Sequence, residues 1–169
     1  APDYFGSASY YARGGIGLRI ETETELTRQT ARSLRLPPGV AGRIAAWSDR
    51  RDYSKPLVLR VSSGPQWKSF SLADREKFLT AEWTLRSESD RVGYRLGGPG
   101  LKADPPEIIS EPVRIGSVQV PDNGQPIVTM RDGPTVGGYP KIAVVEDEDL
   151  AWLAQCRPSQ PVKFRLVQL

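Results

Sequence analysis

The sequence SDRVGYRLGGPGL, residues 89–101, is the first of three stretches that are dense in glycine and proline. The second is EIISEPVRIGSVQVPDNGQPIV, residues 107–128, and the third is DGPTVGGYPKIAVV, residues 132–145. Together they hold more than half of the chain's 16 glycines, interleaved with short β-branched runs. This composition is typical of short strands joined by tight turns, with backbone amides exposed at the corners. We therefore expect a functional surface to be built from these three stretches.

Short strands are predicted on both sides of these turns as well as within them. The Asp-Asn-Gly triplet at residues 122–124 suits a hairpin turn that needs positive φ. The final segment alternates, with Val162, Phe164 and Leu166 on one face and Lys163 and Arg165 on the other. The predicted strands are 57–65, 83–86, 94–96, 107–110, 117–120, 127–130, 142–145 and 162–167.

Two short helices complete the prediction. Ser71 can cap the first one, whose inward stripe would contain Leu72, Phe78 and Leu79. The second covers residues 148–155, with acidic residues in its first turn and a proline beyond its end. Many short strands with two short helices favour a mainly β fold, a closed or nearly closed antiparallel β-barrel.

Composition excludes several classes of function. The chain has 169 residues, which suits one domain, and its net charge of +3 comes from well-mixed residues, which argues against nucleic acid as a partner. No apolar run is long enough for a membrane span. Without histidine there is no Ser-His-Asp or Cys-His dyad and no metal site is expected. The single Cys156 is expected to be a buried residue that only fills space in the core, in keeping with a reducing, cytoplasmic location.

The third stretch carries most of the candidate site residues. The backbone amides from Thr135 to Gly137 and Gly138 can bind an anionic or ureido oxygen, or they can simply form a barrel corner. Tyr139 and Lys141 follow directly. Tyr139 can form a hydrogen bond or shuttle a proton, and Lys141 can hold an anionic group of a substrate or take part in catalysis. The alternative for Lys141 is an exposed strand residue. Residues 97–100 pose the same choice between an amide site and a corner.

Further candidates come from the first two stretches. Arg91 and Arg95 can each grip a carboxylate, whereas Asp90 beside Arg91 can equally form an internal ion pair that fixes a loop. Gln119 can orient an amide or lactam carbonyl, or it can be a buried glutamine that bonds backbone. Glu107 and Glu111 share one strand face if 107–111 is extended, either as paired carboxylates or as solvated ones.

The order of motifs resembles one protein family. SDRVGYRL is followed by SEPV-x-x-G-x-VQVP-x-x-G-x-PI, then by DGPTVGGYPKIAVV and by DL-x-x-LAQ-x-x-P. This order resembles the allophanate hydrolase subunit 2 family, also called the biotin-dependent carboxyltransferase or KipA family, which includes the C subunit of 5-oxoprolinase. The dense match runs from Trp83 to the end, with a weaker echo in residues 6–17.

The resemblance implies a cyclophilin-like β-barrel over residues 56–169. It also implies that residues 1–55 are the remainder of a preceding β-rich domain plus a linker, so that the chain is the C-terminal part of a longer protein. Family members open 5-oxoproline to glutamate using ATP, together with an allophanate hydrolase subunit 1 (KipI)-like partner. For this activity the expected catalytic residues are Lys141, Tyr139 and Arg91.

Two other functions stay open at this point. One is a carboxyltransferase acting on urea or a similar small amide, with biotin carried by a separate protein because no biotin-accepting motif is present. The other is a non-catalytic, KipA-like regulatory binding protein. For the 5-oxoprolinase function, the expected substrate-binding residues are Arg95, Gln119, Thr135, Gly137 and Gly138.

Overall fold

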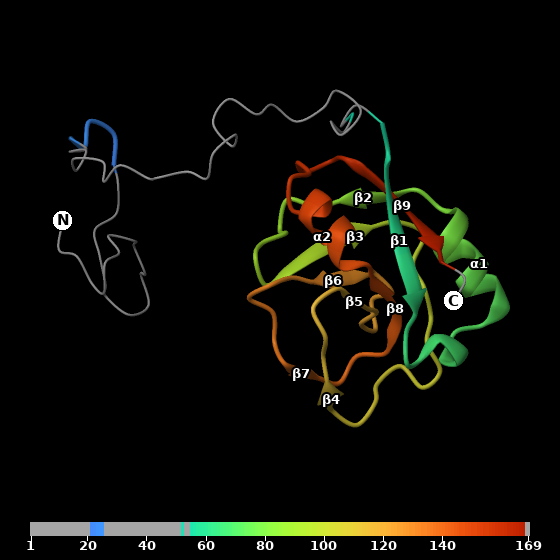
Figure 1. Ribbon diagram of the computed structural model, residues 1–169. Coiled ribbons are helices and arrows are strands. Elements are labelled where there is room, and N and C mark those ends of the chain that lie inside the picture. The colour runs from blue at the N-terminus through green and yellow to red at the C-terminus, as the bar shows by residue number, and fades with distance from the viewer. Residues whose placement is uncertain (1–20, 26–51, 53–54, 168–169) are drawn as a thin grey trace, which may run out of the picture. The chain divides into compact units, whose positions relative to one another are not determined.

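The structure is a computed structural model that describes residues 21–25, 52 and 55–167. Within this part, seven strands close into a barrel in the order β1-β8-β5-β6-β3-β2-β9, and two further strands, β4 and β7, pair beside it (Figure 1). The barrel strands are β1 (Leu57–Ser63), β2 (Trp83–Leu85), β3 (Gly93–Gly97), β5 (Ser117–Gln119), β6 (Ile127–Thr129), β8 (Lys141–Val145) and β9 (Pro161–Leu166). The other elements are β4 (Glu111–Pro112), β7 (Val136–Gly137), α1 (Leu72–Thr80), α2 (Asp147–Leu153) and a 3₁₀ turn (Trp67–Ser69). The prediction of a mainly β closed barrel with two short helices is confirmed.

One pair of barrel strands is parallel, which the expectation of an antiparallel barrel did not include. β1 pairs with β9 in parallel register, from Leu57 opposite Val162 to Val61 opposite Leu166. The other six neighbouring pairs are antiparallel. Strand direction cannot alternate all the way around a closed ring with an odd number of strands. One parallel pair is therefore the geometric consequence of closing this barrel with seven strands.

The core is filled by the inward face of each strand. In β1 the residues Leu57, Leu59 and Val61 are buried, and in β9 the inward residues include Phe164. Helix α1 adds Phe78, whose ring stacks on Phe164 with 4.3 Å between centroids. These contacts close the barrel on the side covered by α1, at the right of Figure 1.

The start of α1 is capped as the sequence predicts. The backbone N–H of Asp74 donates to Ser71 Oγ at 3.0 Å. Phe78 is fully buried as expected, but the predicted inward position of Leu72 is wrong, because that side chain is 80% exposed. Leu72 is the first helical residue, and side chains in a first turn point back beyond the helix start. The C-terminal half of this nine-residue helix makes the contact with the barrel.

The prediction of a strand at residues 107–110 is also wrong. This segment is irregular, with Ile109 94% exposed, and the paired strand β4 begins only at Glu111. A strand needs a partner along its length, whereas here only the Ile108 N–H bonds across, to the carbonyl of Gly138. The other predicted strands and both helices are present, with ends that shift by at most two residues.

Most of the predicted N-terminal segment, residues 1–55, lies outside the described residues, so its separation from the barrel at 55/56 stays a prediction. Among the described residues, no helix has the length and apolar character needed to cross a bilayer.

Candidate functional site

Polar side chains are buried on the outside of the barrel where β3, β5 and β6 lie side by side. Val118 and Val128 point into the core, so alternation directs Gln119 and Thr129 outward. Nevertheless Gln119 is only 7% exposed and Thr129 only 2%. Something must therefore cover this patch of the outer surface.

The cover is the β4–β7 ribbon, which we define as residues 108–113 together with residues 135–139. Its strands pair antiparallel, with Glu111 opposite Gly137 and Pro112 opposite Val136. The ribbon lies at the lower edge of the barrel in Figure 1, outside the barrel sheet. Beneath it is a cavity of about 460 Å³, a size typical of small-molecule sites. The lining includes Arg95, Gln119, Ile127 and Thr129 from the barrel and Val136, Gly137, Gly138 and Tyr139 from the ribbon.

Gln119 presents a hydrogen-bond acceptor to this cavity. Its Nε2 donates to Thr129 Oγ1 at 2.8 Å, which fixes the orientation of the amide. Its Oε1 lies 3.1 Å from the position that a Cβ on Gly137 would take. Within the described residues no donor bonds this oxygen. An amide oxygen held in this way can accept a hydrogen bond from an N–H or O–H group of a ligand.

Arg95 supplies the positive charge of the cavity. It lies on the outward face of β3 and is exposed, and no carboxylate of a described residue forms an ion pair with its guanidinium. Asp90 also lines the cavity, but its Oδ1 already accepts bonds from the backbone N–H groups of Val92 and Gly93. Beside the Asp90 carboxylate, the lining therefore offers a guanidinium for the carboxylate of a small ligand and an amide oxygen for its hydrogen-bond donor.

Lys141 lies beside the cavity and is not part of its lining. It is 2% exposed, and its Nζ is 2.7 Å from Glu111 Oε1 on the ribbon. Gln66 joins the two, because its Nε2 donates to Glu111 Oε1 at 2.9 Å and its Oε1 accepts from the Lys141 N–H at 3.0 Å. The ion pair with Lys141 is the main reason that the pKa of Glu111 lies below its ordinary value, and the Gln66 bond adds to the effect.

The Glu111 carboxylate should make stability depend on acid pH. A carboxyl group with a depressed pKa in the folded state stabilises the fold above its unfolded-state pKa, and this contribution is lost as pH falls through the folded-state pKa. We expect the free energy of unfolding to fall more steeply below about pH 4.5 in the wild type than in Glu111→Gln. Urea unfolding at a series of pH values measures this.

Glu82→Gln is the matched control for that experiment. Glu82 pairs with Lys163 at 3.6 Å, but both side chains are about half exposed, so water screens the pair. This variant should leave the acid dependence close to that of the wild type. Equal slopes for the wild type and Glu111→Gln would contradict the prediction.

The predicted site residues divide into two groups. Five of them line the cavity, namely Arg95, Gln119, Gly137, Gly138 and Tyr139. Three do not: Lys141 is buried against Glu111, Thr135 is exposed on the ribbon, and Arg91 is 85% exposed and paired with Asp132. Their roles in binding or catalysis stay predictions.

Several structural details resolve alternatives that the sequence left open. Asp90 does not pair with Arg91, because it caps its own turn. Gln119 bonds a side chain, Thr129, rather than backbone. Thr129 was missed, although alternation around the apolar Val128 places it on the same outward face as Ile127.

The glycine-rich corner at residues 97–100 is occupied by internal contacts. The Gly98 N–H donates to Gln125 Oε1 at 2.8 Å, and a Cβ on Gly98 would lie 2.4 Å from the Trp83 ring. Gly100 has a φ of 73°, which favours glycine. These contacts support the interpretation of a barrel corner rather than an amide site.

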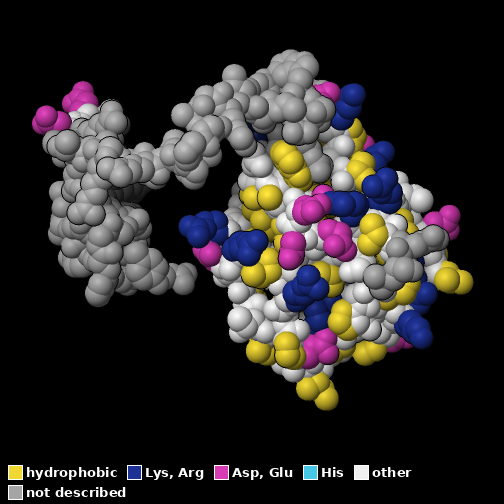
Figure 2. Space-filling model, viewed as in Figure 1, with side chains coloured by type: hydrophobic (Ala, Val, Ile, Leu, Met, Phe, Trp, Pro, Cys, Tyr) yellow, Lys and Arg dark blue, Asp and Glu magenta, His cyan; other side chains and the backbone are white. Residues whose placement is uncertain are grey.

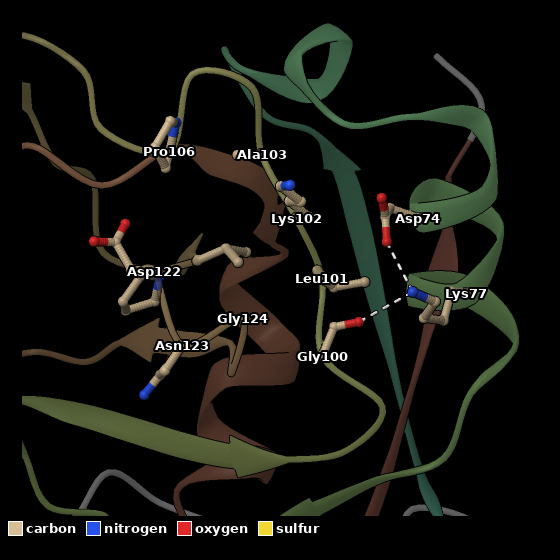
Figure 3. A pocket seen from close by; sticks show the side chains of 12 residues that line it. Asp74, Lys77, Gly100, Leu101, Lys102, Ala103, Pro106, Asp122, Asn123 and Gly124 are labelled. Atoms are coloured by element: carbon tan, nitrogen blue, oxygen red, sulfur yellow. Dashed lines mark hydrogen bonds and ion pairs between the residues drawn. The ribbon is translucent and has the colours of Figure 1, made fainter.

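A second cavity, of about 310 Å³, lies between α1, residues 100–103 and the turn at residues 121–124 (Figure 3). Of the candidates taken from the sequence, its lining contains only Gly100, from the corner at residues 97–100. Lys77 Nζ is already bonded to Asp74 Oδ1 at 2.9 Å and to the Gly100 carbonyl at 3.2 Å. Because Lys77 is paired with Asp74 and the lining also holds the Asp122 carboxylate, this cavity is a weaker candidate for an anion site.

Charged side chains are mixed rather than gathered on one face of the described part of the chain. On the face seen in Figure 2, Lys and Arg side chains lie among Asp and Glu side chains. The described part of the chain contains no group of three or more acidic, cysteine or histidine residues that could hold a metal ion. The cavity beneath the ribbon is therefore the best candidate site.

Known proteins are similar to this chain in sequence and in fold. The C subunit of 5-oxoprolinase from Haemophilus influenzae is 45% identical over 113 residues, which cover 66% of this chain and 37% of the relative. Urea amidolyase of Lachancea kluyveri is 24% identical over 186 residues, covering 96% of this chain and 10% of the relative. The crystal structure of TTHA0988 superposes with a TM-score of 0.58 and 35% identity, over 69% of this chain and 22% of that one.

The chain spans little more than a third of the length of the curated 5-oxoprolinase subunits that it matches. Over residues 1–166 it matches the family model described as "Carboxyltransferase domain, subdomain A and B". That match covers both the barrel and the ribbon that encloses the cavity. The chain therefore belongs to the carboxyltransferase domain, subdomain A and B, family.

Proposed function

We propose that this chain supplies the substrate-binding barrel of a 5-oxoprolinase-type complex, which opens 5-oxoproline to glutamate at the expense of ATP. In this proposal the cavity beneath the β4–β7 ribbon binds 5-oxoproline, and an allophanate hydrolase subunit 1-like protein is the partner. The 45% identity with a 5-oxoprolinase subunit supports the assignment.

The observation that carries the proposal is that Gln119 and Arg95 line the same cavity. 5-Oxoproline has a lactam N–H, which can donate to Gln119 Oε1, and a carboxylate, which suits the Arg95 guanidinium. The ribbon brings the backbone of Gly137 and Gly138 to the same cavity. Their small size leaves room for a ligand to approach the backbone closely.

The role of the chain is binding and orientation of the lactam. Ring opening adds one water across the lactam C–N bond, and the released amine takes up a proton. Among the described residues, no nucleophile with an adjacent base lines the cavity. ATP does not fit this lining, which offers one guanidinium and no ammonium for a highly charged triphosphate. We therefore assign nucleotide binding to the rest of the complex.

Binding of 5-oxoproline and of 2-pyrrolidinone, which lacks the carboxylate, tests this assignment. We expect the chain to prefer 5-oxoproline by about 10-fold or more, and Arg95→Gln to lose most of that preference, because a charge-assisted hydrogen bond is removed. Calorimetry or ligand-detected NMR measures both affinities.

Arg165→Gln is the matched control, since Arg165 is an exposed arginine of β9 that does not line the cavity. It should bind both ligands as the wild type does. The activity itself is tested by reconstituting the chain with its partner proteins and measuring ATP-dependent glutamate formation. An inactive complete complex would contradict the proposed function.

A carboxyltransferase acting on urea is the second candidate. The family model and the match to urea amidolyase along 96% of this chain favour it. Gln119 Oε1 could accept from a urea N–H in the same cavity, with biotin carried by a separate protein. Product formation that depends on carboxybiotin and needs no 5-oxoproline would favour this candidate over the first.

A further inference from the structure

Within the described residues, few polar contacts link the β4–β7 ribbon to the barrel. Between its two strands it is internally bonded, for example from the Val113 N–H to the Thr135 carbonyl at 2.8 Å. It is a separate two-stranded sheet and shares no strand with the barrel. The Glu111 side chain crosses from the ribbon to the barrel, where it meets Lys141 and Gln66.

Four residues, each next to the following one, form a closed ring at the edge of the cavity. Gln119 on β5 is the register partner of Lys141 on β8. Lys141 binds Glu111, and Glu111 is the register partner of Gly137 in the ribbon. Gly137 in turn lies close to Gln119, because a Cβ at this position would lie 3.1 Å from Gln119 Oε1. Neighbouring residues of this ring are thus linked by strand pairing, by an ion pair or by close packing.

We propose that Lys141 is a positioning residue whose buried ammonium, acting through Glu111, holds Gly137 in place over Gln119 and so sets the width of the cavity. This differs from the catalytic role that the sequence predicts for Lys141. The ammonium group faces Glu111, and the residue is not part of the lining.

Burial explains why the ion pair between Lys141 and Glu111 can hold the ribbon against the barrel, a role that we call a latch. A lysine that is 2% exposed cannot satisfy its charge with water, so movement of Glu111 away from it would leave a buried unpaired cation. The closed position of the ribbon is therefore favoured over open ones. Exposed pairs such as Lys163 with Glu82 lack this property, because water replaces the lost partner.

Hydrogen exchange of individual amides tests the latch without any ligand. The reporters are the N–H groups of Ile108 and Val113, which bond within the ribbon, and the reference is the N–H of Leu96, which bonds to Pro126 in the barrel. In Lys141→Met and in Glu111→Gln we expect the reporters to exchange about 10-fold faster or more, with the reference unchanged. Methionine is close to lysine in volume and apolar, so the barrel should tolerate it.

The double variant Lys141→Met/Glu111→Gln separates a latch from two independent effects. If the two residues act through each other, the double variant exchanges no faster than the faster single variant. A rate equal to the product of the two single effects, an unchanged reporter, or a uniform rise across the barrel would each overturn the proposal. Lys163→Met/Glu82→Gln serves as the matched pair, which should leave the ribbon reporters unaffected.

A kinetic measurement distinguishes positioning from catalysis and rests on the proposed function. In the reconstituted 5-oxoprolinase complex, Lys141→Met should raise KM about 10-fold and leave kcat within about threefold. A loss of kcat of about 100-fold or more at unchanged KM would identify Lys141 as a proton-transfer group and overturn the proposal. If the complex opens no 5-oxoproline, the proposed function fails, while the exchange experiment still decides whether the latch exists.

Discussion

Replacing Phe78 with alanine should lower the free energy of unfolding by about 4 kcal/mol. Phe78 is fully buried, stacks on Phe164 at 4.3 Å and lies 6.4 Å from the Trp83 ring. Truncation removes apolar contact on both sides and leaves a cavity where α1 meets the barrel. The Trp83 Nε1–H also donates to the Phe78 carbonyl at 3.1 Å, so a shift of α1 would disturb a buried bond as well.

Urea unfolding followed by tryptophan fluorescence measures this loss. Leu72→Ala is the matched control, because Leu72 lies in the same helix and is 80% exposed. Its effect should stay within about 0.5 kcal/mol. A loss below about 2 kcal/mol for Phe78→Ala would show that α1 is not essential to closing the barrel core.

The barrel was predictable because its signals are local. Alternation in β1 and β9 marks one inward face, and the Asp-Asn-Gly turn contains Gly124 with a φ of 72°, as a tight hairpin requires. The capping Ser71 marks the start of α1. Each of these features depends on residues within a few positions of one another, so periodicity and turn chemistry are enough to find them.

The ribbon and its ion pair could not be predicted because they depend on contacts distant in sequence. Lys141 contacts Glu111 and Gln66 in the folded barrel although the three are far apart in sequence, and no local pattern links them. Both ribbon strands are two residues long, which is too short for alternation to show. The candidate site was predicted in part, since Gln119 and Gly137 lie in the glycine-rich stretches that line it. Residues that the ribbon covers, such as Thr129, read as ordinary strand positions.

Gln119 provides the sharpest test of the ligand, because it should distinguish a lactam from its lactone analogue. In 5-oxotetrahydrofuran-2-carboxylate a ring oxygen replaces the lactam N–H with almost no change of shape. This oxygen would face Gln119 Oε1 without a proton between them, so the wild-type chain should bind it about 10- to 100-fold more weakly than 5-oxoproline. Competition calorimetry gives the two dissociation constants.

In Gln119→Leu the preference for the lactam should disappear. Leucine keeps most of the volume but removes the acceptor, so 5-oxoproline should weaken by about 10- to 100-fold, to the level of the lactone. The substitution also leaves Thr129 Oγ1 without its bond from Gln119, so stability must be measured alongside. Gln125→Leu is the matched control, since Gln125 bonds Gly98 at the barrel corner and does not line the cavity.

The outcome separates two explanations of why a glutamine is buried on the outside of a barrel. If Gln119 serves only to satisfy Thr129, the wild type and Gln119→Leu will rank lactam and lactone alike. If Gln119 accepts a hydrogen bond from the ligand, the substitution changes the relative affinity for lactam and lactone, and not merely the overall affinity. Because one amide group bonds Thr129 with its nitrogen and leaves its oxygen toward the cavity, the geometry favours the second explanation.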